Sequence, residues 1–364
     1  MFGKSSKKTI AAFMLFCAVA FGIWLITKDP VLMWYWLFGL AFGCIMQHFG
    51  LCFVTSMSDP FLTGSTAQLR GILIGILVAS LGITAIKYLS GGALDFLGVS
   101  AISLPLMLGA FIFGIGMTIA GCCTSGMFIR LAEGYAVHLI TMMFVIAGYL
   151  FANSHYETVW APFVKKSPVI FLPETFGWLA GVGLHIAIIL LLYTAAVRWE
   201  KGESFSSPSK YLTGGILLGV FSILHYIILN SGWSITGAFF WIGDIFDLAF
   251  DFAAGESDSG LLSSDNAMIT ALGSNLRNIG MFAGALICAV AFAGFRFRKI
   301  NSAKQIIKSA AGGSLMGYGA CMAGGCNISA FFTAAASLSL SAWVFMIFLL
   351  AGVFTGIKLL FKLV

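Results

Sequence analysis

The sequence predicts an all-α, multi-pass membrane protein of about ten transmembrane helices, built as two inverted-topology repeats with discontinuous or re-entrant Gly-rich helices. Three observations predict this fold: a hydrophobic composition, a series of long apolar segments and an internal repeat. Of the 364 residues, 60% are hydrophobic and 9% are charged, whereas soluble domains carry about 25% charged residues. Too few charges are present to cover a water-soluble surface, which excludes a soluble enzyme, a nucleic-acid-binding protein and a disordered chain.

Apolar segments long enough to cross a bilayer follow one another along the whole chain, since a span needs about 20 residues. They lie at about residues 9–27, 33–48, 71–90, 103–120, 134–153, 173–197, 211–229, 269–294, 311–335 and 341–361. The first segment ends without an Ala-x-Ala cleavage site, so we expect a retained span and not a cleaved signal peptide.

The basic residues predict the orientation of these spans. With a cytoplasmic N-terminus, 15 of the 20 Lys and Arg residues fall on the cytoplasmic side, as the positive-inside rule requires. Both termini are then expected in the cytoplasm, and the net charge of +6 reflects orientation rather than a partner. The segment 230–268 is expected outside, because it carries six acidic residues and no Lys or Arg. Part of it, near 239–250, is expected to re-enter the membrane.

An internal repeat relates two Gly-rich segments, 114–123 and 317–326, at an offset of 203 residues. GIGMTIAGCC aligns with GYGACMAGGC, so that three glycines, one alanine and the final cysteine coincide. Arg70 and Arg277 begin matching helices upstream, and Gly50-Leu51-Cys52 faces Gly232-Trp233-Ser234 in a looser register. An odd number of spans separates the two copies, so they should have opposite orientations in the membrane.

These relations predict one integral membrane domain, 1–364. We assign 31–153 to repeat A, 173–197 to a linking span and 210–361 to repeat B, with 9–27 as an additional N-terminal span.

The repeated glycines predict a break in a membrane-spanning helix. Gly costs about 1 kcal/mol relative to Ala in a helix interior, and an unpaired backbone group in lipid costs more, so such a break must line a protein cavity. Residues that favour helix N-caps follow the cysteines, namely Thr124-Ser125 in one half and Asn327 and Ser329 in the other. Two inward-pointing helix N-termini would suit an anion. The alternative is that these glycines only permit close helix packing, which does not explain the recurring cysteine.

Eight cysteines without a CxxC pair predict neither a disulfide framework nor a metal site, and no cofactor or catalytic residue is expected. A neutral thiol is a weak donor and a polarizable contact, suited to a large sulfur-bearing anion. A thiolate would repel that anion, so the thiols must stay protonated while the substrate is bound. Cys17 and Cys288 lie in uninterrupted apolar spans and are expected to be small hydrophobic residues, whereas the role of Cys44 is left open.

Three cysteine motifs resemble those of the YeeE/YedE family of sulfur transporters: GLCF at 50–53 with Ser58-Asp59, AGCCTSG at 120–126 and GACMAGGCN at 319–327. The resemblance covers about residues 30–360. It implies an hourglass-shaped importer of thiosulfate in the cell inner membrane, with one cysteine per motif passing the anion along by S–H hydrogen bonds. It also implies a cytoplasmic sulfur-accepting protein as a partner. Carried over, the substrate-binding positions are Cys52, Cys123 and Cys326.

Ten further residues are secondary candidates for the pathway, because they flank these cysteines or carry charge near the helix ends. They are Gly121, Cys122, Thr124, Cys321, Gly324, Gly325, Asn327, Arg70, Arg277 and His48. Cys122 forms a vicinal pair that the family resemblance does not account for. The two arginines either attract the anion or anchor their helices at the interface, and Arg130 and Glu133 can pair across one helical turn.

Other functions remain open at this stage. The family is also linked to selenium compounds, so its name does not fix the substrate. A membrane thiol oxidoreductase using Cys122, Cys123, Cys321 and Cys326 would lack a CxxC motif. A soft-metal channel would need methionines aligned with the cysteines, and the 15 Met residues are scattered. No phosphate-binding Gly-x-x-x-x-Gly-Lys-Ser/Thr motif is present.

Overall fold

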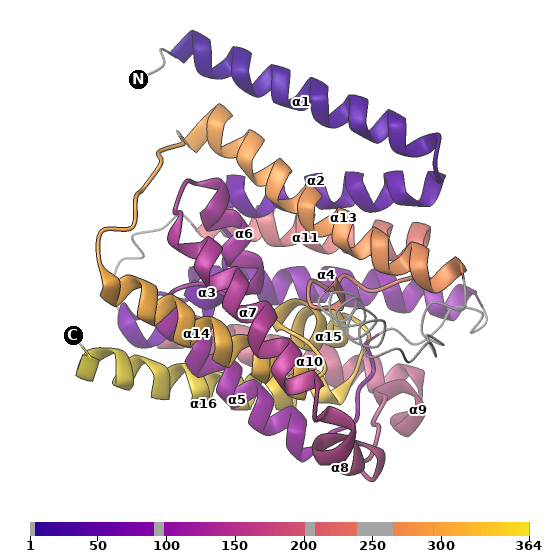
Figure 1. Cartoon of the computed structure of the whole chain (residues 1–364). Coiled ribbons are helices and arrows are strands. Elements are labelled where there is room, and N and C mark those ends of the chain that lie inside the picture. The colour runs from indigo at the N-terminus through magenta and orange to yellow at the C-terminus, as the bar shows by residue number, and fades with distance from the viewer. Residues whose placement is uncertain (1–3, 91–97, 201–207, 239–264, 294, 364) are drawn as a thin grey trace, which may run out of the picture.

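The computed structural model of the chain describes residues 4–90, 98–200, 208–238, 265–293 and 295–363. The segment near 239–250 that the sequence predicts to re-enter the membrane lies outside these residues. In the described part the regular secondary structure is helical, and strand pairing is limited to isolated bridges. The helices lie side by side in one bundle (Figure 1). This confirms the all-α fold.

Eight helices of the described part are long and apolar enough to cross a membrane, and up to ten spans result if each of two bent helix pairs counts as one. This agrees with the expected number of about ten. The long helices are α1 (Lys4–Ile26), α2 (Pro30–Phe49), α4 (Ala67–Leu89), α5 (Leu104–Ala120), α7 (Val137–Asn153), α10 (Trp178–Trp199), α11 (Pro208–Leu229), α13 (Asp265–Cys288), α14 (Ala303–Met322) and α16 (Leu340–Leu363).

Three of these helices are interrupted and continued by a short helix. After α2 the chain resumes as α3 (Phe53–Leu62), and after α5 it resumes as α6 (Thr124–Ala132). After α14 it resumes as a π-helical segment, Asn327–Thr333, with a bend of 45°. The predicted span 311–335 is therefore a broken span, as its glycines indicate. The remaining short helices are α8 (Ala161–Lys165), α9 (Leu172–Phe176) and α15 (Ala334–Ala336).

Helices from the two halves of the chain pack against each other in reciprocal pairs. α2 packs against α13, and α4 packs against α11. In the same way α5 packs against α16, and α14 packs against α7, while α5 and α14 contact each other at the centre. If α2, α4, α5 and α7 correspond to α11, α13, α14 and α16, exchanging the halves reproduces every one of these contacts.

Glycines allow these helices to approach closely. A β-carbon on Gly43 of α2 would lie 2.0 Å from the carbonyl oxygen of Met281 in α13. In the matching pair, a β-carbon on Gly215 of α11 would lie 1.9 Å from the carbonyl oxygen of Gly71 in α4. Backbones this close exclude any larger residue, which is the usual arrangement for helix association in lipid.

The first helix lies at the edge of the bundle (Figure 1). It contacts α2 and α13, where Trp36 donates from Nε1 to the Ala18 carbonyl oxygen at 2.9 Å. Leu25, Leu32 and Leu276 are buried in the small apolar cluster between these helices.

Substituting a glycine at a helix contact should destabilise the protein, whereas the same change on a lipid-facing surface should not. Gly43→Ala must push α13 away, and such overpacking costs about 1–3 kcal/mol. Gly183→Ala in α10 meets no atom within 4 Å and should be neutral or slightly stabilising, because Ala favours the helix. Thermal unfolding in detergent, followed by size-exclusion chromatography, measures both. Equal melting temperatures for the two variants would contradict this account of the packing.

Candidate functional site

The three predicted substrate cysteines share one local geometry. Each lies at the N-cap of the helix that follows a break, two residues after a glycine with a positive φ angle. These pairs are Gly50 (φ 68°) and Cys52, Gly121 (φ 70°) and Cys123, and Gly324 (φ 68°) and Cys326. The glycine accepts the left-handed conformation that ends one helix, and the cysteine starts the next. Each thiol therefore lies beside the partly positive N-terminus of a short helix.

Cys52 and Cys123 meet at Gly126. A β-carbon on Gly126 would lie 3.3 Å from the Cys123 sulfur and 3.5 Å from the Cys52 sulfur. The Gly126 N–H donates to Cys123 Sγ at 3.3 Å, and the Cys52 N–H donates to Gln68 Oε1 at 3.2 Å. Glycine at 126 thus leaves the space in which the two thiols approach each other.

Cys326 has hydroxyl neighbours instead. Its N–H donates to Ser329 Oγ at 2.9 Å. The Ser329 hydroxyl in turn donates to Cys326 Sγ, with 3.7 Å between oxygen and sulfur. Thr236 Oγ1 lies 3.4 Å from Ser329 Oγ. At the repeat offset of 203 residues, Ser329 takes the place of Gly126.

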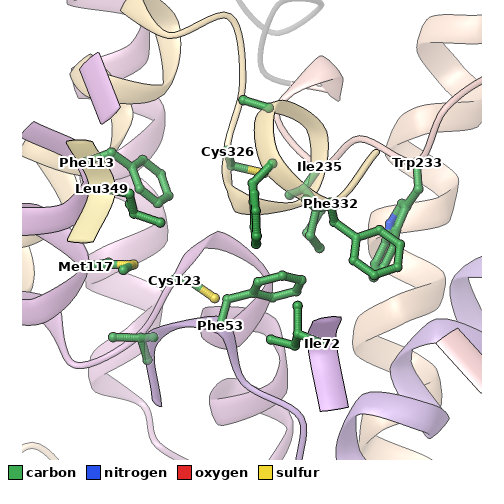
Figure 2. Packing of buried hydrophobic residues seen from close by; sticks show 14 of the residues in the cluster. Phe53, Ile72, Phe113, Met117, Cys123, Trp233, Ile235, Cys326, Phe332 and Leu349 are labelled. Carbon is green, nitrogen blue, oxygen red and sulfur yellow. The ribbon is translucent and has the colours of Figure 1, made fainter. Parts of the chain in front are cut away.

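Apolar side chains lie around Cys326 and Cys123 (Figure 2). Phe53 and Phe332 contribute rings whose centroids lie 6.3 Å apart in an edge-to-face arrangement, and Ile235 packs in the same cluster. Both thiols are fully buried. Neither thiol is reached by solvent in this conformation.

Cys52 opens onto a cavity of about 210 Å³. Two hydrogen bonds to the Glu133 carboxylate form its polar wall. Gln47 Nε2 donates to Glu133 Oε1 at 3.2 Å, and Arg130 Nη1 donates to Glu133 Oε2 at 3.1 Å. The pairing of Arg130 with Glu133 agrees with the sequence prediction. Of the three cysteines, only Cys52 is incompletely buried.

Arg130 also borders a larger cavity of about 490 Å³ whose other charged lining residues are all basic: Arg298, Lys299 and Lys308. The segment that brings them there is held by backbone pairing, since the Arg298 N–H donates to the Gly134 carbonyl oxygen at 2.8 Å. Gly134 has a φ of 100°, and a β-carbon there would lie 2.2 Å from the Arg296 carbonyl oxygen. We call the residues Arg130, Arg298, Lys299 and Lys308 the basic mouth.

We call Cys52, Cys123 and Cys326 the tip cysteines. Three secondary candidates lie next to the tip cysteines and are buried. Cys122 Sγ lies 3.3 Å from His138 Nδ1, and His138 lines the basic mouth cavity. Thr124 Oγ1 and Asn327 Oδ1 have no hydrogen-bond partner among the described residues. These two buried oxygens occupy matching positions in the repeat, each directly after a tip cysteine.

Close packing at the break after α14 also explains Gly325. A β-carbon there would lie 2.3 Å from Ser329 Oγ, so Gly325 leaves room for the serine. Cys321 is buried and is the penultimate residue of α14.

Other candidates lie away from the tips. His48 is exposed and packs edge-on against Phe292. Arg70, in the first turn of α4, forms an ion pair with Glu200. Cys44 donates to the Gly284 carbonyl oxygen at 3.2 Å within the contact of α2 with α13.

Arg277 lies in the middle of α13, and its side chain is buried, with 2% of the residue exposed. Its sequence position suggests instead a residue at the membrane interface near the outer face. Its Nη1 donates to His225 Nε2 at 2.8 Å, and its Nη2 donates to the Ser234 carbonyl oxygen. The guanidinium also lies 5.5 Å from the centre of the Tyr35 ring.

Sequence reasoning missed four polar or small residues of the site, Gln68, Gly126, His138 and Thr236, and it named Ser329 only as a residue that favours a helix N-cap. The repeat offset carried a signal for one pair of positions, because Gly126 and Ser329 both stand three residues after a tip cysteine. His138 and His225 each contact another polar group, Cys122 and Arg277 respectively.

Broken membrane helices tipped with thiols, together with a basic mouth, are features of a membrane transport protein. Comparison with known proteins identifies the kind: the chain belongs to the sulphur transport family, whose model matches residues 48–355. It is a multi-pass membrane transporter of sulfur compounds.

Curated relatives cover nearly the whole chain. The thiosulfate transporter TsuA of Spirochaeta thermophila is 27% identical over 348 residues, which are 90% of this chain and 98% of the relative. TsuA of Escherichia coli is 26% identical over 338 residues, 87% of this chain and 91% of the relative. The probable transporter YedE of Escherichia coli is 29% identical over 168 residues, 45% of this chain and 40% of the relative.

The exposure of the thiols predicts their reactivity. In single-cysteine variants, a membrane-impermeant maleimide should label Cys52 through its cavity, whereas Cys123 and Cys326 should react slowly because they are fully buried. With cytoplasmic termini, labelling of Cys52 is expected in inside-out vesicles and not in right-side-out vesicles. Labelling of Cys52 from the outer side only would reverse the predicted orientation.

Proposed function

We propose that this protein imports thiosulfate, or a closely related small sulfur anion, across the cell inner membrane through a path formed by Cys326, Cys123 and Cys52. One observation carries the proposal: all three thiols lie at the N-caps of broken helices inside the bundle. Relatives named thiosulfate transporters, which align with almost the full chain, support the choice of substrate.

The order of the thiols follows from the proposed orientation. With cytoplasmic termini, Cys326 lies in the outer half of the path, and Cys123 and Cys52 lie in the inner half. The anion would meet Cys326 first, pass the rings of Phe53 and Phe332, and reach the pair of thiols at Gly126. From there the cavity beside Cys52 leads to Arg130 and the basic mouth, which would attract the anion toward the cytoplasm. There it would pass to a cytoplasmic sulfur-accepting protein.

Each thiol would act as a weak hydrogen-bond donor and a soft contact for the terminal sulfur. The adjoining helix N-terminus would supply favourable electrostatics without a full positive charge. An anion held only by such groups is bound and released without displacing a fixed counter-charge. Binding of this kind favours transfer from one site to the next.

We further propose that the two halves are inverted repeats related by an approximate two-fold axis in the membrane plane. The reciprocal helix pairs support this relation, since α2 with α13 mirrors α11 with α4. Such symmetry puts the substrate path at the interface of the repeats, where the thiols lie.

Single substitutions of the three thiols test this function. In cells that lack their own thiosulfate uptake, Cys52→Ser, Cys123→Ser and Cys326→Ser should each lower the uptake of labelled thiosulfate at least about tenfold, because a hydroxyl is harder and smaller than a thiol. Cys17→Ser, whose side chain is exposed on α1, is the matched control and should transport normally.

Protein levels in the membrane, measured by immunodetection, must be equal for this comparison. Normal uptake by all three variants would refute the thiol path. Uptake of labelled selenosulfate by the same cells would show whether selenium analogues share the path.

A further inference from the structure

A fourth helix tip contains hydroxyl groups where the other tips contain a thiol. Gly232-Trp233-Ser234 follows α11 and corresponds in sequence to Gly50-Leu51-Cys52. Ser234 Oγ accepts from the Gly237 N–H at 3.1 Å, as Cys123 Sγ accepts from the Gly126 N–H. The serine thus starts a helical turn in the manner of the tip cysteines.

The fourth tip contacts the Cys326 tip directly. Thr236 Oγ1 lies 3.4 Å from Ser329 Oγ, and Thr333 Oγ1 donates to the Trp233 carbonyl oxygen at 2.7 Å. Thr236 is 2% exposed. Where the first half brings two thiols together at Gly126, the second half brings two hydroxyls together beside Cys326.

A buried positive charge lies behind this tip. Arg277 donates to the Ser234 carbonyl oxygen, and its Nε has no hydrogen-bond partner among the described residues. His225 Nε2 must accept from Arg277, since a guanidinium only donates, and His225 Nδ1 then donates to the Ser231 carbonyl oxygen at 2.9 Å. His225 is therefore neutral.

This charge is not balanced by an acidic side chain in the described part of the chain, where ion pairs form only at Arg70, Arg130 and Lys165. The contrast with Arg70 is direct, because its partner Glu200 is acidic. A buried arginine inside a membrane is costly, and an anionic group near it offsets that cost.

We propose that Thr236 and Ser329, backed by the charge of Arg277, form a binding site for the oxygen end of the substrate on the outer side of Cys326. The site takes small anions that join a sulfonate group to a soft sulfur or selenium atom. The hydroxyls donate to the sulfonate oxygens, which are hard acceptors, while the Cys326 thiol contacts the soft end. The substrate is thereby oriented before it reaches the thiol pair at Gly126. This inference rests on the proposed function.

Removing the hydroxyls tests the site. Thr236→Val keeps the shape of the side chain and should raise the KM for labelled thiosulfate about tenfold or more, the effect of one lost hydrogen bond to a charged group. The maximal rate at saturating thiosulfate should change little. Ser329→Ala should act in the same direction, and Thr236→Ser should restore the KM of the unaltered protein.

Thr355→Val is the matched control, because the Thr355 hydroxyl only contacts the carbonyl oxygen of Ala351 on an exposed face of α16. Hydrosulfide, which has no sulfonate group, supplies a second readout as a competitor of thiosulfate uptake. The preference for thiosulfate over hydrosulfide should shrink in Thr236→Val and Ser329→Ala, and it should persist in Thr355→Val. A folding defect would lower the amount of protein in the membrane without changing this preference.

The outcomes separate this inference from the proposed function. An unchanged KM and preference in Thr236→Val and Ser329→Ala, together with lost uptake in Cys326→Ser, would overturn the oxygen site and leave the thiol path standing. Absence of thiosulfate uptake by the unaltered protein would overturn both.

Discussion

The backbone hydrogen bonds released at each helix break are the constraint on which the rest of the structure depends. In lipid an unpaired amide or carbonyl costs several kcal/mol, so a membrane helix can be broken only where protein surrounds it. The reciprocal helix pairs supply that enclosure, and their glycines bring the backbones close enough to exclude lipid. Enclosed N-termini are in turn suited to an anion, because their N–H groups and dipoles point into the protein. Packing and function thus rest on the same glycines.

The fold was largely predictable because its signals are local. Apolar segments and the glycines before Cys123 and Cys326 indicate the spans and their breaks, and the structure contains both. Long-range contacts could not be predicted in this way. No local pattern shows that Gly126 leaves room for the Cys52 thiol, or that α13 carries Arg277 to the centre of the bundle. His48 illustrates the opposite error, since its position near a glycine turn says nothing about the helix face on which it lies.

The two halves differ in chemistry more than in architecture. The first half combines two thiols with an arginine, Arg70, whose charge is matched by Glu200. The second half combines one thiol with hydroxyls and an arginine that contacts a neutral histidine. If the two halves are repeats, as we propose, a duplicated scaffold would present different donors to the two ends of one small anion.

The glycine turn at Gly134 has a consequence for the basic mouth. Backbone pairing at this turn fixes the segment that carries Arg298 and Lys299, so their backbone is held beside the cavity although their side chains are exposed. These charges line one cavity. Dissolved ions screen their field, so it acts on an anion mainly within a Debye length, about 8 Å at physiological ionic strength. If the basic mouth faces the cytoplasm, as we propose, the salt concentration there would set how strongly the anion is drawn inward.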